Sequence, residues 1–487
     1  MLKPTSSEIQ SYAADYSMIP LCREIYADVT TPIALLRKIA QVSNRYCLLE
    51  SVEGGERWGR YSFLGYDPLV HIVCKDHVVT TEYADGRRES VTTDQPNDIL
   101  RALMAQYKAP RIEGFPPFTG GLVGYYAYRM IGYAEPTLHL RSSDVDDFDL
   151  MLFDKVIAYD HLSQKIDVIV NMPTDNVLEN YGTARAEIEK MIRLIREPMQ
   201  LPTAHKHCKP QFTCNVTKEE YCDIVNKTKQ HIVDGDIFQA VLSRRFETPY
   251  TDSLLDAYRV LRTTNPSPYM VYLHRDDIEL MSTSPETLVR LRNGRLSTFP
   301  VAGSRPRGAD KEEDLALEKD LLSDEKELAE HNMLVDLGRN DIGKLSQFGS
   351  VEVTDYQMIH RYSRIMHITS VVEGNILPKF DAFDAISTLL PAGTLSGAPK
   401  IRACEIIEEL EPCARGVYGG ALGYVDFTGN MDTCIAIRMA VKKNDRVTIQ
   451  AGGGIVADSI PENEYMESQN KAGAVIAAIE RAAEVDA

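Results

Sequence analysis

Several features are missing from this sequence of 487 residues, and each absence excludes a class of protein. It has no run of about 18 consecutive apolar residues, which is the length that a membrane-spanning helix needs. Polar sequence follows Met1 where a signal peptide would have an apolar core, so we expect a cytoplasmic location. The nine cysteines are dispersed and form no CxxC pair, which predicts reduced thiols and excludes a disulfide framework.

Positive charge is also scarce. Acidic residues outnumber basic ones by 71 to 53, and the basic residues are scattered, so neither nucleic acid nor a membrane surface is an expected partner. The glycine-rich segments match neither the phosphate-loop pattern G-x-x-x-x-G-K-[ST] nor the dinucleotide pattern G-x-G-x-x-G. A Mg2+-dependent nucleotide enzyme is therefore disfavoured, and an ATP-binding titration would test that alternative.

A proline-punctuated stretch at residues 197–210 is the best candidate for a boundary between regions 1–205 and 206–487. His205, His207 and Cys208 lie in this stretch without further ligands at zinc-finger spacing, so we interpret them as linker residues. Before the stretch, residues 70–73 and 155–159 read as strands and 180–196 as a helix. After it, helices at 218–234 and 461–483 alternate with extended segments at 269–273 and 447–450. This pattern indicates a mixed α/β or α+β protein with large sheets.

Two of the predicted helices each carry a pair of glutamates three positions apart, which places both side chains on one helix face. The pairs are Glu327 with Glu330 and Glu464 with Glu467. A single pair of this kind is usually solvated charge. Four carboxylates brought together would repel one another unless a hard divalent cation neutralised them, and a set of oxygen ligands favours Mg2+ over Zn2+.

Capping signals predict where these two helices begin. Ser323 is the expected N-cap of the first, which should end near Gly338. Ser459, Pro461 and Glu462 predict a capping box with proline in the first turn of the second.

Three glycine-rich segments could offer backbone N–H groups to an anion, at residues 301–305, 391–400 and 451–455. The second leads directly into a helix predicted at 401–410, whose N-terminal dipole suits a carboxylate or a phosphate.

Together these segments resemble the chorismate-utilising enzymes. The matching motifs are SPE at 284–286, PVAGSRPRG at 300–308, DEKELAEHNMLVDLGRND at 324–341, PAGTLSGAPK at 391–400, RGVYGG at 415–420 and the segment 451–471. They stand in a fixed order, and the resemblance covers essentially the whole chain. It implies a fold of two large, mainly antiparallel sheets that pack together and are surrounded by helices.

The resemblance also assigns site residues. It makes Glu330 and Glu467 direct Mg2+ ligands, with Glu327 and Glu464 completing the set directly or through water, so that the metal binds the ring carboxylate of chorismate. Positions that match substrate contacts are Gly303, Ser304, Tyr418, Arg438, Gly452, Gly453 and Gly454. A bidentate arginine with nearby amides is what a dicarboxylate requires.

Three further positions match catalytic residues. Glu286 matches the general acid that helps the ring hydroxyl leave, His367 matches the residue placed to remove the ring proton, and Thr394 lies in the loop that lines this pocket. Without the resemblance, Glu286 reads as a helix-start acid and His367 as a core histidine, so geometry has to decide.

Two positions discriminate between the reactions of the family. In members that form aminodeoxychorismate, the position that matches Ala302 resembles a lysine that attacks the ring. In members that form isochorismate, the position that matches Gln239 is a lysine base that activates water. An alanine cannot attack the ring, and glutamine cannot take a proton at neutral pH. The expected reaction is therefore chorismate plus ammonia to anthranilate plus pyruvate, the first committed step of tryptophan biosynthesis. Isochorismate or aminodeoxychorismate formation remains the alternative within the family.

Free ammonia is mostly protonated at neutral pH, so a delivery system is expected. No G-x-C-x-G glutaminase motif surrounds any cysteine. We therefore expect a separate glutamine amidotransferase subunit as partner.

The N-terminal half resembles the feedback-inhibited members of the family, in which two segments hold L-tryptophan. Ser51 and the segment Pro268, Tyr269 and Met270 match them, with Cys434 also shaping the pocket. A non-catalytic tryptophan-binding regulator is a second alternative, although such a protein would not need Glu286 and His367.

Overall fold

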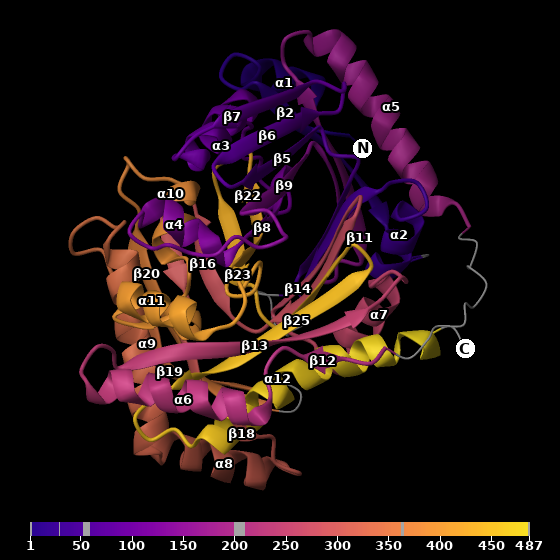
Figure 1. The fold of residues 1–487 in the computed structure, drawn as a ribbon. Helices are drawn as coiled ribbons and strands as arrows, with labels where there is room; N and C mark the ends of the chain where they lie inside the picture. Colours follow the sequence, from indigo (N-terminus) through magenta and orange to yellow (C-terminus); the bar gives the residue numbers. More distant parts are fainter. Residues whose placement is uncertain (1, 29, 52–58, 199–209, 362–364, 486–487) are drawn as a thin grey trace.

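The protein is built on two large antiparallel sheets that share one interior. A computed structural model describes residues 2–28, 30–51, 59–198, 210–361 and 365–485. Within these residues every strand pairing is antiparallel. Helices cover the outer faces of the sheets (Figure 1). The expected fold is confirmed.

The first sheet has 13 strands in the described residues. Their order is β1 (Leu2–Lys3), β2 (Met18–Tyr26), β11 (Lys165–Pro173), β10 (Lys155–Asp160), β4 (Tyr61–Tyr66), β3 (Arg45–Glu50), β14 (Tyr269–Arg275), β15 (Ile278–Ser284), β24 (Met439–Lys443), β25 (Arg446–Ile455), β13 (Gln239–Pro249) and β12 (Thr213–Cys214), with β21 (Gly397–Ala398) on β13.

The second sheet has 12 strands in the same residues. Their order is β18 (Val301–Pro306), β20 (Ile365–Asn375), β17 (Arg295–Thr298), β16 (Thr287–Arg292), β23 (Met431–Ile435), β22 (Ala421–Asp426), β8 (Gly121–Tyr126), β9 (Phe148–Phe153), β5 (Val70–Lys75), β6 (Val78–Tyr83) and β7 (Arg88–Thr92), with β19 (Glu352–Arg361) on β20.

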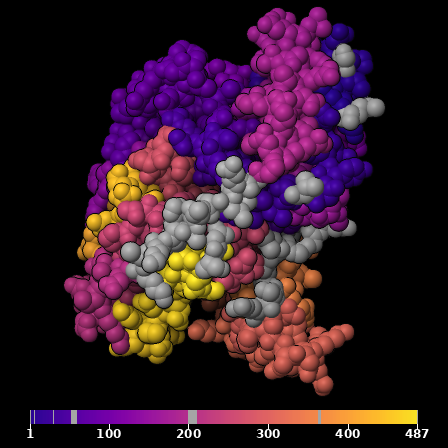
Figure 2. All heavy atoms as spheres, turned by 90° about the vertical axis from the view of Figure 1, so that its right-hand side faces the viewer, coloured from indigo at the N-terminus to yellow at the C-terminus, as the bar shows by residue number. Residues whose placement is uncertain are grey.

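The helices form two outer layers. Those packed on the first sheet include α2 (Pro32–Ile39), α5 (Val177–Arg196), α6 (Lys218–Val233), α7 (Leu255–Thr264), α11 (Lys400–Leu410) and α12 (Pro461–Glu480). Those associated with the second include α3 (Pro96–Met104), α8 (Lys311–Ser323), α9 (Glu325–Gly343) and α10 (Ala382–Leu389). Two short helices, α1 (Ser6–Tyr12) and α4 (Ile131–Ala134), complete the set. Figure 2 shows α5 along the outside of the N-terminal part of the molecule.

The three largest apolar clusters of the described residues hold these layers together. One fills the space between the first sheet and its helices, and another lies between the second sheet and α3, α9 and α10. A third joins the sheets directly, because it contains Cys47 and Phe63 from the first together with Val123 and Met151 from the second. Burial of these side chains on both faces of each sheet explains why many strands are nearly continuous apolar runs.

Both sheets contain strands from either side of the predicted boundary. In the first, β3 pairs with β14, and in the second, β8 pairs with β22. The boundary between residues 205 and 206 itself lies outside the described residues, as do His205, His207 and Cys208. The two regions do not form separate sheets, and the division into regions 1–205 and 206–487 stays a prediction.

Secondary structure follows the sequence pattern closely, with three exceptions at helix ends. The first glutamate helix is capped by Asp324, whose side chain accepts from the N–H groups of Lys326 and Glu327, so Ser323 was the wrong N-cap. The capping box predicted at Ser459 is also absent. Its Oγ accepts from the N–H of Val456 at 3.1 Å, in the turn before the helix, and the N-cap is Ile460.

The first glutamate helix also runs five residues beyond Gly338, to Gly343, so Gly338 does not mark its end. A Cβ at Gly338 would stand 3.1 Å from Cγ2 of Thr298 and 3.6 Å from Cγ2 of Val372. The glycine thus lets α9 approach β17 and β20 closely, which a propensity argument based on the helix alone could not show.

The eight cysteines in the described residues are all free, as predicted. None of the described helices is both long and apolar enough to cross a membrane.

Candidate active site

The predicted acid Glu286 lies in the interior, at the junction of β15 and β16. Its Oε2 accepts a hydrogen bond from Oγ1 of Thr394 at 2.9 Å, although the two residues are 108 positions apart. Burial raises the pKa of Glu286, while the hydrogen bond from Thr394 and the charges of Lys471 and Arg438 lower it. Burial is the largest of these effects, so the carboxyl retains its proton to higher pH than an exposed glutamate and can donate it.

His367 lies on β20, opposite Ser304 on β18. Its Nδ1 lies 3.1 Å from the carbonyl oxygen of Gly303, and a carbonyl can only accept, so Nδ1 carries the proton and Nε2 is the basic nitrogen of the neutral ring. Burial lowers the pKa of His367, which keeps the ring neutral near pH 7. Gly303 has a φ of 75°, a left-handed conformation that suits glycine, and this forms the bulge facing His367.

Arg438 connects these two groups electrostatically. It lies between β23 and β24 with a φ of 50°, an uncommon conformation for a residue with a side chain. Its positive charge acts on both Glu286 and His367. Burial lowers the pKa of Arg438, and the charges of Glu286, Tyr418 and Glu467 oppose this effect. A cation at this position matches an anionic substrate held between the acid and the base.

Tyr418 forms another wall of the site. Its side chain is buried, and burial raises its pKa to about 12, so the hydroxyl stays a neutral donor. Arg415 lies over its ring at 5.7 Å and also donates to the carbonyl of Leu395 at 2.6 Å. This arginine therefore ties the wall to the loop that carries Thr394.

The glycines 452–454 lie on β25, opposite Leu242 and its neighbours on β13. A Cβ at Gly453 would stand 3.0 Å from Oε2 of Glu464 and 3.5 Å from Oε1 of Glu467, so both carboxylates border this strand. A Cβ at Gly454 would stand 2.7 Å from Nε2 of Gln239, which places that amide at the same surface.

Lys471 also borders the site, although it was not among the residues predicted from the sequence. Its Nζ donates to the carbonyl of Gly452 at 3.1 Å and pairs with Oε1 of Glu467 at 2.6 Å. It also acts on the pKa of Glu286. The signal was available, because Lys471 follows Glu467 by four positions on one helix and therefore shares its face.

The four glutamates predicted to bind Mg2+ are oxygen donors of the kind that a hard divalent cation prefers. In the described residues, however, their carboxylates are not gathered around one point. The pKa of Glu330 is raised by burial, then by the charge of Glu327 and, across the helices, of Glu467. Repulsion between carboxylates of α9 and α12 is what a cation would relieve. Nevertheless, no three acidic, histidine or cysteine side chains of the described residues stand close enough to hold a metal. The Mg2+ site stays a prediction.

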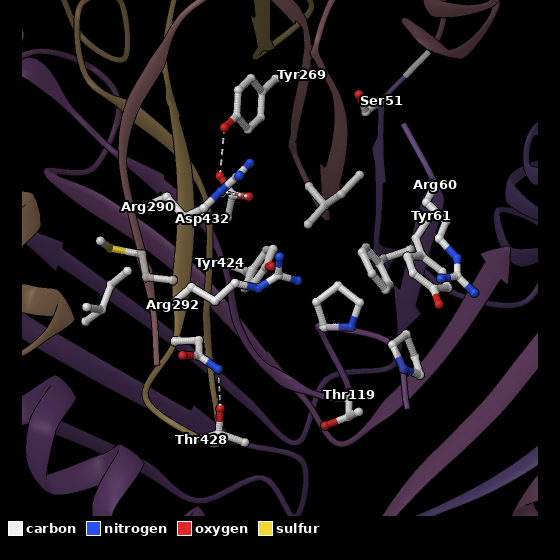
Figure 3. A pocket seen from close by; sticks show the side chains of 18 of the residues that line it. Ser51, Arg60, Tyr61, Thr119, Tyr269, Arg290, Arg292, Tyr424, Thr428 and Asp432 are labelled. Carbon is white, nitrogen blue, oxygen red and sulfur yellow. Dashed lines mark hydrogen bonds and ion pairs between the residues drawn. The ribbon is translucent and has the colours of Figure 1, made fainter. Parts of the chain in front are cut away.

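The four residues predicted to hold tryptophan lie together in a cavity separate from the residues predicted to bind Mg2+. Ser51, Pro268, Tyr269 and Met270 line a cavity of about 620 Å3 between the two sheets (Figure 3). The Oγ of Ser51 is buried and has no hydrogen-bond partner among the described residues. Cys434 does not line this cavity but is buried in the cluster between the sheets.

Comparison with known proteins identifies the family to which the chain belongs. Residues 47–477 match the family model described as chorismate binding enzyme. The chain belongs to this family. Within the family it is 45% identical, over the whole of both chains, to anthranilate synthase component 1 of Acetivibrio thermocellus. It is 44% identical to the Pseudomonas aeruginosa protein of the same name, over 97% of this chain and 98% of that protein.

Two solved structures have the same fold as this chain. Anthranilate synthase component I from Streptococcus pneumoniae aligns with a TM-score of 0.78 and 36% identity, over 93% of this chain and 99% of that one. The menaquinone-specific isochorismate synthase of Escherichia coli aligns with a TM-score of 0.70 over 97% and 98%, but at 18% identity it shares the fold alone.

Proposed function

We propose that this chain is the chorismate-converting component of an anthranilate synthase. The observation that carries the proposal is the half-buried constellation of Glu286, Thr394, Arg438 and His367, in a chain 42–45% identical along its length to proteins of that name. The reaction joins chorismate and ammonia and releases anthranilate, pyruvate and one water.

Each residue then has a defined task. Arg438, Tyr418 and the amides of the glycine strand bind the carboxylates of chorismate. Glu286 gives its proton to the leaving ring hydroxyl, which departs as water while ammonia adds to the ring. Nε2 of His367 takes the ring proton as pyruvate is eliminated and the ring becomes aromatic.

The neighbours of the site support ammonia as the nucleophile. Position 302 is a buried alanine on β18, and position 239 is a glutamine at the glycine strand. Neither side chain can attack the ring or activate water. Ammonia needs neither kind of help, since its lone pair is nucleophilic without activation.

Mg2+ is the cofactor that we propose for the carboxylates of α9 and α12, with Glu330 and Glu467 as the principal ligands. When bound, the cation would neutralise the carboxylates and polarise the ring carboxylate of chorismate. Lys471, which pairs with Glu467, keeps part of this negative charge balanced.

The partner that we propose is a glutamine amidotransferase subunit that supplies ammonia. The relatives' names describe them as component 1, which implies a second component. We also propose that L-tryptophan binds the cavity between the sheets, where Ser51 offers a buried hydroxyl.

The purified chain, incubated with chorismate, Mg2+ and ammonium at alkaline pH, should release anthranilate, detected by its fluorescence, and an equal amount of pyruvate. Isochorismate or aminodeoxychorismate as the only product would contradict the proposal. Binding of tryptophan without any turnover of chorismate would instead favour a non-catalytic regulator.

A further inference from the structure

One strand connects the large cavity with the proposed acid. β16 begins at Thr287, directly after Glu286, and Arg290 on the same strand lines the cavity of about 620 Å3. Thr287 also lines a second, small cavity of about 60 Å3, together with Glu286 and Thr394. Thr287 does not line the large cavity itself, but its side chain contacts Tyr269, which does.

A chain of hydrogen bonds runs from Thr287 to the cavity wall. The hydroxyl of Tyr269 donates to Oδ1 of Asp432 at 2.8 Å and lies 2.9 Å from Oγ1 of Thr287. Because tyrosine has one hydroxyl proton and the carboxylate takes it, Thr287 is the donor to Tyr269. Nε of Arg290 donates to the other oxygen of Asp432 at 2.9 Å (Figure 3).

The backbone around Glu286 is tied to the same residues. The carbonyl of Glu286 accepts from the N–H of Ile435 at 3.0 Å, and Ile435 and Asp432 lie on the one strand β23. The register between β16 and β23 shifts between Thr287 and Val289, which is a β-bulge. Bulges are frequent next to active sites, where they bend the strand and re-aim a side chain.

We infer that Thr287 is a positioning residue that transmits occupancy of the large cavity to Glu286. A ligand that contacts Tyr269 or Arg290 shifts their bonds to Asp432 and Thr287, and the bulge carries this shift into the peptide of Glu286. The acid then no longer lies where it meets Thr394. The inference rests on the proposed function, since it takes tryptophan as the ligand and Glu286 as the acid.

The experiment compares tryptophan binding with tryptophan inhibition in Thr287→Val. Binding is measured by calorimetry on the full chain, and inhibition by anthranilate formation from chorismate and ammonium. Binding should stay within about threefold of the parent, whereas the concentration for half-inhibition should rise at least tenfold, within the usual range of coupling between sites. The hydroxyl of Tyr269 keeps its bond to Asp432, so the cavity wall loses no partner.

Two variants sharpen this result. Thr287→Ser keeps the hydroxyl and should be inhibited like the parent. Thr433→Val removes another buried hydroxyl bonded to β16, at the carbonyl of Val289, but lies outside the network and should also be inhibited like the parent. If Thr287→Val does not fold, Thr287→Ala removes the same hydroxyl with a smaller side chain and is used in both measurements in its place.

The outcomes distinguish failure of the proposed role of Thr287 from failure of the proposed anthranilate synthase function. Normal inhibition of Thr287→Val, or an equal loss in Thr433→Val, overturns the link while the parent still binds tryptophan and makes anthranilate. A parent that binds no tryptophan removes both the proposed effector and the link. A parent that is inactive with chorismate contradicts the proposed function itself.

Discussion

Glu286 shows how a single side chain acquires its role from its surroundings. Burial keeps the proton on the carboxyl, and Thr394 fixes the direction of one oxygen. Glu286→Gln retains the shape and a donor but cannot transfer a proton, so kcat should fall by roughly 10²–10⁴-fold with little change in KM for chorismate. Steady-state anthranilate formation measures this. Glu352→Gln, an exposed site on β19, is the matched control and should keep parental activity.

The pKa shifts of the acid and the base predict the pH dependence of kcat. Activity requires protonated Glu286 and neutral His367 at once. The rate, expressed per neutral ammonia, should fall at high pH as Glu286 loses its proton and at low pH as His367 gains one. Because burial raises the first pKa and lowers the second, the active window widens at both ends. A low-pH limb that persists unchanged in His367→Gln would contradict the assignment of that limb.

The proposed ligands of Mg2+ can be tested by binding as well as by turnover. Glu330→Gln or Glu467→Gln should weaken Mg2+ binding in the presence of chorismate by at least tenfold, because each variant removes a charged oxygen ligand. Calorimetric titration with Mg2+ gives a readout that does not depend on activity. Glu325→Gln, in the first turn of α9, is a control that should bind Mg2+ normally. Unchanged binding in both ligand variants would exclude the predicted site.

At the level of elements, a buried ion pair joins α11, β13 and the loop of Thr394. Arg415 and Glu411 are almost fully buried and meet at 2.6 Å, and Glu411 also accepts from the N–H and hydroxyl of Ser243. Glu411→Gln leaves the arginine charge buried without its partner, so unfolding free energy should drop by about 3–5 kcal/mol. Urea denaturation measures this loss. Glu405→Gln breaks an exposed pair on the same helix and should change stability by less than about 1 kcal/mol.

The contact between α9 and β20 should make stability depend on pH. Nε2 of His331 lies 2.7 Å from Oγ of Ser370, and burial lowers the pKa of the histidine. The folded state thus holds the neutral ring, while the unfolded chain takes up a proton below about pH 6.5. This contribution to stability is present above that pH and is lost as pH falls further. In His331→Gln the decrease in melting temperature between pH 7.5 and 5.5 should become smaller, and an unchanged decrease would assign it to other groups.

For the whole molecule, the shared sheets predict that the two regions fold together. Removing residues 1–209 would expose the edges of β14 and β22 and open the cluster between the sheets. Residues 210–487 expressed alone should therefore show no cooperative unfolding, whereas the full chain should unfold in one main calorimetric transition. A sharp transition in the isolated region would show that it folds independently.

Much of the fold could be predicted from local patterns. Apolar periodicity placed α5, α6 and α12 within a few residues, because amphipathic spacing follows from burial of one helix face. The ends at Ser323, Gly338 and Ser459 were wrong, since neighbouring elements decide which donor caps a helix and where a glycine lets two elements meet.

The site divides in the same way. The sequence alone determined that the chain has acidic pairs and glycine-rich segments suited to an anion, and that positions 302 and 239 are not lysine. Residue types limit the available chemistry in this way. Only the tertiary structure decided that Glu286 meets Thr394, that Arg438 acts on both acid and base, and that Ser51 faces a separate cavity with Tyr269. Those interactions join residues at least 71 positions apart in the sequence. Strand pairing and burial set their distances, and no local pattern encodes them.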